Sequence, residues 1–243
     1  MAAESEADGM GEPQDAGPGA SGRPPRLVHP GLWLFAPNRD SQGGSAWYLE
    51  GGELDVLVDA PALSEANRQW LQARCGRRGW IVLTGRQGHG RLRALQAELG
   101  WPVLVQEQEA YLLPTVPAVT AFAAEHQLAA GLELLWTPGP SPGACVLHAR
   151  SGPAGDGLFC GRLLVPAAPQ QLLPLRRQGT FHWPRQLRSV ERLRHWLPSG
   201  SPDWIASGAA LGALRGAAVV DQGAARLAGL DLETLSAQQP EGG

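Results

Sequence analysis

Short apolar runs separated by turn-forming glycine and proline set the strongest limit on how this chain can fold. In the first half, three strand-like runs come first, and later runs are separated by segments with helical spacing. The runs rich in β-branched or aromatic residues lie at 27–35, 46–50, 54–59, 80–84 and 102–106. Strands of this length that alternate with helices predict an α/β layered domain.

Helix signals lie between these runs. Ser64 can cap a helix that extends to about Arg74, and residues 92–99 carry leucine at helical spacing before Gly100. The second half repeats the pattern, with a helix at 185–197 and strands at 132–136, 144–148, 158–160 and 204–206. Two β-rich layers flanked by helices are therefore expected over residues 27–230.

Both ends of the chain differ in composition from this domain. Residues 1–26 lack aromatic residues, are rich in Gly, Pro and Ala, and carry five acidic residues against two arginines. We expect a disordered tail there, because such a segment has little apolar surface to bury. Its role is either a docking arm or a solvated extension. Residues 231–243 are expected to be a disordered C-terminus.

Charge and cysteine content exclude several classes of protein. The 20 basic residues, all arginine, oppose 23 acidic ones, and a net charge of −3 argues against a chain-wide nucleic-acid binder. No apolar run is long enough for a membrane span, and no secretory signal is visible. The three cysteines show no paired spacing. These features favour a cytoplasmic protein with reduced thiols, and the Arg-, Ala- and Gly-rich composition indicates a GC-rich, bacterial genome.

Five short motifs occur in a fixed order along the chain. They are a strand ending at Asp59, TGRQGHG at 84–90, TPGPSPG at 137–143, LFCGRLL at 158–164 and IASGAA at 205–210. Together they resemble the metallo-β-lactamase-like hydrolase superfamily, in the branch that is similar to glyoxalase II. The resemblance covers residues 29–210 and implies a four-layer αββα sandwich.

The resemblance also implies where metal ligands would stand. In that superfamily histidines and aspartates hold two zinc ions, which activate a bridging water as the nucleophile. The matching positions here are Gly85, Gln87, His89, Gly90, Pro140, Arg162 and Ala209. All seven differ from the family's ligands, and only His89 and, poorly, Gln87 could donate to a metal. Turn and scaffold residues are kept, among them Thr84, Gly139, Gly143, Gly161 and Gly208. The chain is therefore interpreted as a degenerate member with no metal cofactor.

Arg162 is the most informative of these changes, because a permanent guanidinium charge cannot share a small pocket with a dication. In one interpretation Arg162 fills the former metal cavity and pairs with carboxylates such as Asp59. In the other, Arg162 forms an anion subsite with Arg86, His89 and Gln87 that binds a carboxylate or phosphate. Both interpretations place Arg162 beside Asp59 and the 85–90 loop. The third alternative is a surface position, which applies if the motif alignment is shifted.

Other candidates have a structural and a functional interpretation. His89 is either a general base or a hydrogen-bonded loop residue, and Cys145 and Cys160 are either nucleophiles or buried thiols. Six arginines between 176 and 194 indicate either a nucleic-acid patch or the solvated side of a helix. The 85–90 loop lacks the lysine and hydroxyl of a phosphate loop.

The function we predict from the sequence is non-catalytic binding of a small anion or a protein partner in the vestigial cleft. The alternative is a hydrolase that acts without metal, or with one metal at a relocated site built on His89. Nucleic-acid binding is a third and less favoured class.

Overall fold

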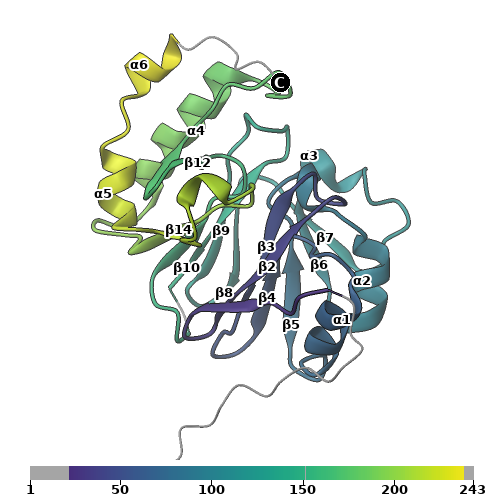
Figure 1. The fold of residues 1–243 in the computed structure, drawn as a ribbon. Coiled ribbons are helices and arrows are strands. Elements are labelled where there is room, and N and C mark those ends of the chain that lie inside the picture. The colour runs from purple at the N-terminus through teal and green to yellow at the C-terminus, as the bar shows by residue number, and fades with distance from the viewer. Residues whose placement is uncertain (1–21, 151, 238–243) are drawn as a thin grey trace, which may run out of the picture.

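The computed structural model describes residues 22–150 and 152–237, and most of them belong to two β-sheets (Figure 1). The first sheet has seven strands in sequence order: β1 (Arg26–His29), β2 (Leu32–Asn38), β3 (Gly44–Leu49), β4 (Asp55–Val58), β5 (Gly79–Val82), β6 (Val103–Gln106) and β7 (Val119–Phe122). The strands from β4 to β7 run parallel to one another.

The second sheet has six strands in the order β15-β14-β11-β10-β9-β8. Their bounds are β8 (Glu125–Ala129), β9 (Leu132–Trp136), β10 (Cys145–Ala149), β11 (Gly157–Phe159), β14 (Trp204–Ala206) and β15 (Val220–Asp221). The hairpin of β12 (Val165–Ala168) and β13 (Gln171–Leu173) forms a separate two-stranded unit.

Helices flank the two sheets on their outer sides (Figure 1). The helices beside the first sheet are α1 (Glu65–Gln72), α2 (Leu92–Leu99) and α3 (Glu107–Ala110). Those beside the second are α4 (Trp183–Trp196), α5 (Gly223–Ala228) and α6 (Leu232–Ser236). Two short 3-10 turns are η1 (Arg86–Gly88) and η2 (Gly212–Leu214). This arrangement confirms the predicted four-layer αββα sandwich.

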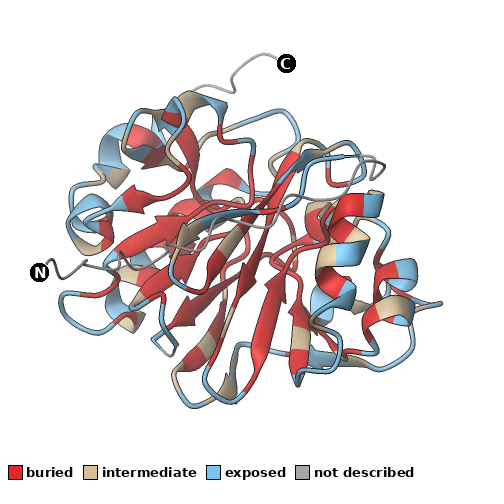
Figure 2. Cartoon of the chain, turned by 60° about the horizontal axis from the view of Figure 1, so that its bottom comes forward, coloured by how far each residue is buried: buried red, intermediate tan, exposed pale blue. Residues whose placement is uncertain are grey.

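The alternation of side chains along the central strands explains why two layers of core form. In β4, Val56 and Val58 belong to the cluster that includes residues of both sheets, whereas Leu57 packs in the cluster that includes α1 and α2. In β5, Val82 likewise belongs to the cluster between the sheets, and Ile81 packs in the cluster with α1 and α2. A strand buried on both faces reads as a continuous apolar run, which is how these strands appear in the sequence. Most residues of β4 and β5 are accordingly buried, and red predominates in the strands at the centre of Figure 2.

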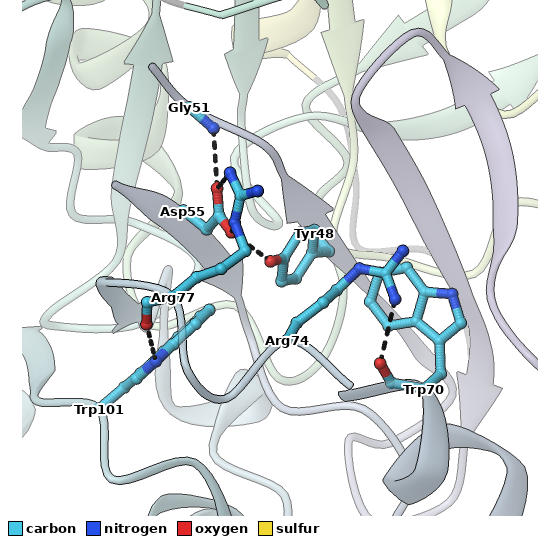
Figure 3. A network of polar contacts seen from close by, with 7 residues as sticks. All are labelled: Tyr48, Gly51, Asp55, Trp70, Arg74, Arg77 and Trp101. Atoms are coloured by element: carbon cyan, nitrogen blue, oxygen red, sulfur yellow. Dashed lines mark hydrogen bonds and ion pairs between the residues drawn. The ribbon is translucent and has the colours of Figure 1, made fainter. Parts of the chain in front are cut away.

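A buried polar network anchors the amino-terminal end of β4 (Figure 3). The Asp55 side chain has no exposed surface. It accepts hydrogen bonds from the Tyr48 hydroxyl at 2.5 Å and the Gly51 backbone N–H at 3.2 Å, and Arg77 binds both of its oxygens. Trp101 Nε1 donates to the Arg77 carbonyl at 3.0 Å. A buried carboxylate needs such partners, because an unpaired charge away from water is strongly destabilising.

The C-terminal prediction requires a correction. Residues 231–243 were expected to be disordered, but α6 forms within them. The Asp231 side chain caps this helix by accepting from the Thr234 backbone N–H at 3.0 Å, and Leu235 is buried against Trp183 and Leu187 of α4. The cap and one apolar contact account for the order of a segment that has little periodicity. Residues 238–243 lie outside the described residues.

The predicted boundary at residue 26 lies close to the start of the fold. Arg26 begins β1, and Pro25 is already buried. The disorder predicted for residues 1–21 falls outside the described residues. Across the part of the chain that is described, we find no helix with the length and apolar character needed to cross a bilayer.

Candidate functional site

The five sequence motifs meet at one edge of the sandwich, where the parallel strands end. Asp59 follows β4, Thr84 follows β5, and Gly208 follows β14. Two backbone hydrogen bonds join the sheets here, from Cys145 N–H to the Thr84 carbonyl at 2.9 Å and from Ser45 N–H to the Gly208 carbonyl at 3.2 Å. Segments far apart in the sequence are therefore held together at this edge.

Asp59 lies at the centre of this edge and is buried. Its carboxylate accepts from the Thr84 backbone N–H at 2.8 Å and from the Thr84 hydroxyl at 2.6 Å. Burial raises the pKa of Asp59 to about 6, and the hydrogen bonds from Thr84 and the charge of Arg162 limit that rise. The residue has a left-handed backbone with φ of 60°, which is uncommon outside glycine and turns the chain sharply after the strand.

Backbone occupies much of the space around Asp59. A Cβ atom at Gly88 would lie 2.0 Å from Asp59 Oδ1, and one at Gly208 would lie 3.0 Å from Oδ2. Only glycine allows the chain to approach so closely. The 85–90 loop is therefore packed directly onto the carboxylate.

Arg162 follows β11 and points into the same region. Its Nη2 donates to the carbonyls of Ser41 at 2.8 Å and Gln42 at 3.1 Å. Among the residues that the structure describes, no ion pair joins Arg162 to Asp59 or to another carboxylate. Burial lowers the pKa of Arg162, although Asp59 raises it. Arg162 thus lies beside Asp59 and the 85–90 loop, as both interpretations expected, but its Nη2 binds backbone carbonyls and not the Asp59 carboxylate.

The space left between these groups is very small. A cavity of about 10 Å³ is lined by Asp59, Gly85, Gln87, Pro140 and Arg162 together with neighbouring backbone. This volume is about the minimum that one water molecule requires. The structure therefore brings together five of the residues that the sequence singled out, around a nearly filled centre.

The remaining predicted residues lie elsewhere. Arg86 is exposed, and Ala209 is buried, with its N–H bound to Ser207 Oγ at 3.2 Å. His89 and Gly90 line a different, largely apolar groove beside α2. Burial lowers the pKa of His89 to about 4, so its imidazole is neutral at pH 7. The structure does not place Arg86 or His89 in the walls of the cavity that Arg162 lines.

Comparison with solved structures identifies the arrangement. A HARLDQ motif mutant of a metallo-β-lactamase from Cronobacter sakazakii aligns with a TM-score of 0.59 and 18% identity, over 88% of this chain and 96% of that one. The metallo-β-lactamase SMB-1 bound to 2-mercaptoethanesulfonate gives 0.57 and 18%, over 84% and 91%. An archaeal superfamily protein from Sulfolobus tokodaii gives 0.55 and 15%, over 86% and 88%.

The chain has the metallo-β-lactamase fold. At identities below 20% this likeness concerns the fold alone. No protein-family model matches the sequence, and no curated protein sequence matches it either. Function in this metallo-β-lactamase fold must therefore be argued from its own site.

The residues at this edge do not fit the zinc ions that the fold family implies. Zinc sites use three or four His, Cys, Asp or Glu donors. Within residues 22–150 and 152–237, no group of three such side chains is placed to hold a metal. Asp59 is the one carboxylate in the walls of the small cavity, and Thr84 already binds both of its oxygens. Arg162 adds a positive charge where a dication would lie.

A larger pocket opens beside the filled centre of this metallo-β-lactamase fold. Its volume is about 170 Å³, and it shares Gln87, Pro140 and Arg162 with the small cavity. Arg177 and Thr180 also line it, and none of its lining residues is acidic. Arg177 belongs to the arginine-rich segment noticed in the sequence, but only the fold shows that it shares a pocket with Arg162.

Glu109 also lies near the site, and the sequence motifs did not indicate it. This α3 residue is 1% exposed, and its Oε1 accepts from the Gly143 N–H at 3.0 Å within the TPGPSPG turn. No spacing in the sequence connects residue 109 with that turn.

Cys145 and Cys160 are buried, and burial raises the pKa of Cys160 to about 12 and that of Cys145 well above its usual value. Thiols held in the neutral form are poor nucleophiles.

Proposed function

We propose that this metallo-β-lactamase-fold protein is a metal-free pseudoenzyme that binds a small anion in the pocket beside Arg162 and Arg177. One observation carries the proposal: two guanidinium groups line a pocket of about 170 Å³ that has no acidic residue in its walls. Arginine forks suit carboxylate and phosphate oxygens, and they keep their charge at any physiological pH.

The environment of Arg162 supports this proposal. Its Nη2 is already bound to two backbone carbonyls, which fixes the side chain before any ligand arrives. A pre-ordered group loses less conformational entropy on binding, so more of its interaction with a ligand appears as affinity. The side chain is also partly buried, and a charge removed from water interacts more strongly with a counter-ion.

The hydrolase alternative has less support. A relocated metal site would need His89 and at least two further donors, but His89 lines the apolar groove with Leu92, Leu112 and Val116. None of those neighbours offers a metal ligand. His89 could act as a general base, but it is not in the same pocket as Arg162. Nothing at the filled centre supplies a nucleophile with room for a substrate.

The cellular setting is also a proposal. Cys75 is exposed, Cys145 and Cys160 are buried, and all three are free thiols. Free thiols persist best in a reducing compartment, which favours the cytoplasm.

Calorimetric titration with sodium sulfate at low ionic strength tests the proposal. We expect saturable binding of one sulfate per chain, weakened at least tenfold by Arg162→Met or Arg177→Met. Arg188→Met is the matched control, because Arg188 is an exposed arginine on α4 that lines neither cavity. The proposal fails if sulfate does not bind, or if the control variant weakens binding as much as the pocket variants do.

A further inference from the structure

We infer that the preferred ligand of this pocket is a small phosphate monoester, bound as its dianion. The inference rests on the anion-binding function proposed above and adds the charge, shape and size of the ligand. Three features of the pocket carry it: the charge of its walls, the number of its hydrogen-bond donors, and its limited volume.

The charges around the pocket favour a ligand with two negative charges. Arg162 and Arg177 both line it, and the positive charge of Arg177 lowers the pKa of Arg162. Asp59 lies near Arg162 and offsets part of its charge. Positive charge remains on both arginines, and a dianion compensates more of it than a monoanion does. The first turn of α4, which contributes Gln186 to the lining, also brings the positive end of a helix dipole to the pocket.

The donors in the walls exceed what a carboxylate can use. Besides the two arginines, the pocket is lined by Thr180, Gln42 and Gln87, which carry a hydroxyl and two side-chain amides. The Thr180 oxygen accepts from the Arg177 N–H at 2.9 Å, and its own proton is left to donate. A carboxylate presents two oxygens, whereas a phosphate monoester presents three strong acceptor oxygens. A tetrahedral head group can therefore meet donors from several walls at once, and charge-assisted hydrogen bonds are the stronger ones.

The size and remaining walls limit the organic part. Pro140, Val165 and Leu175 form the apolar portion of the lining. The volume of about 170 Å³ is smaller than the roughly 300–1,000 Å³ of pockets for drug-sized ligands. A phosphate with a short carbon chain fits within this volume, whereas the larger part of a nucleotide would extend beyond it into solvent.

Methyl phosphate, sulfate and acetate are suitable probes for titration calorimetry between pH 5 and pH 7.5. The second pKa of a phosphate monoester is about 6, so the dianion fraction rises about tenfold over this range. We expect methyl phosphate affinity to rise by nearly that factor, and acetate to bind at least tenfold more weakly than methyl phosphate at pH 7.5. Sulfate remains a dianion throughout and reports any change in the protein itself, above all the titration of Asp59, whose pKa is about 6.

The outcomes separate this inference from the proposed function. If no anion binds, the proposed function fails. If acetate binds as tightly as methyl phosphate, or if methyl phosphate follows the pH dependence of sulfate, anion binding stands and the dianion inference is overturned. Arg177→Met gives a second measure: it should reduce the preference for methyl phosphate over acetate at least fivefold. Arg188→Met is the control, and equal unfolding midpoints show that the variants are folded. If Arg177→Met leaves the preference for methyl phosphate over acetate unchanged, the dianion inference is also overturned.

Discussion

Thr84 holds the Asp59 carboxylate with two hydrogen bonds, one from its backbone N–H at 2.8 Å and one from its hydroxyl at 2.6 Å. Arg162, which lies nearby, forms its own hydrogen bonds with carbonyl oxygens instead. The carboxylate is thus satisfied by a neutral neighbour in a buried place. The ionised form is poorly solvated in this buried place, and burial therefore raises the pKa of Asp59 to about 6.

The raised pKa of Asp59 predicts that Asp59→Asn stabilises the protein near neutral pH. The native state keeps its proton up to about pH 6 and the unfolded chain only to about pH 4, so wild-type stability falls as pH rises between these values. Asparagine tolerates the φ of 60° and can keep both contacts with Thr84. Urea unfolding should give a gain of about 2 kcal/mol at pH 7 and none at pH 4. A variant with the same pH slope as wild type would contradict this.

Gly88→Ala should destabilise the fold, because the added Cβ would lie 2.0 Å from Asp59 Oδ1 and the loop would have to shift. Overpacking of this kind costs about 1–3 kcal/mol. Gly52→Ala is the matched control, since no atom lies within 4 Å of a Cβ at that position. Its effect should stay within about 0.5 kcal/mol. Equal unfolding midpoints for the two variants would show that the loop yields freely.

Tyr48→Phe should weaken the anchor at the amino-terminal end of β4. The change removes the 2.5 Å hydrogen bond to Asp55, a carboxylate with no exposed surface. Hydrogen bonds to buried charged groups contribute about 1.5–3 kcal/mol, and that loss should appear in denaturant unfolding. Tyr111→Phe removes the same hydroxyl from a side chain that is 72% exposed and should be neutral. A loss of similar size in both variants would be inconsistent with the anchor.

Elemental analysis of the purified protein should show no stoichiometric zinc, iron or manganese after dialysis against a weak chelator. The reason is the donor set, because tight zinc binding normally needs about four suitable ligands. Zinc titration followed by unfolding provides an independent check, since a ligand that binds the native state raises the midpoint. One retained metal per chain would contradict the expectation.

Deletion of residues 1–21 should leave the unfolding midpoint within about 2 °C of the full chain, because so acidic and Gly/Pro-rich a segment has little surface to bury. Differential scanning calorimetry measures this directly. Deletion through residue 27 is the comparison, since it removes buried Pro25 and the start of β1 and should lower the midpoint. A large drop for the shorter deletion would show that the segment packs on the fold.

The sequence predicted the central elements well because their burial is visible in it. The apolar run at 54–59 contains β4, the run at 80–84 overlaps β5, which begins one residue earlier, and the leucine spacing at 92–99 matches α2. β7 and β8 were missed because most of their residues are only half-buried or exposed, and apolar and polar residues do not alternate along them. The helix predicted at 185–197 begins earlier, at Trp183, because the His182 side chain accepts from the Arg185 N–H and caps it.

At the site, sequence motifs located the residues that strand ends bring together. Asp59, Gln87, Pro140 and Arg162 come from four separate motifs and line one cavity. Arg177 could not be placed in this way, because the chain returns to the site through an irregular segment between β13 and α4. The position of His89 in the groove beside α2 could not be predicted either, since residues in a Gly-rich loop have no periodicity to show which way they face.

The closeness of the 85–90 loop to Asp59 bears on any attempt to rebuild a metal enzyme from this scaffold. Histidines introduced at 85, 87 and 90 would supply donor atoms but not space. Gly90 has a φ of 46°, and a Cβ there would lie 2.9 Å from Ala60 Cβ. The path of the main chain would have to be redesigned before the side chains could work. Introducing the histidines one at a time would therefore pass through poorly folded intermediates. Protein engineers would have to change the loop backbone and the side chains together.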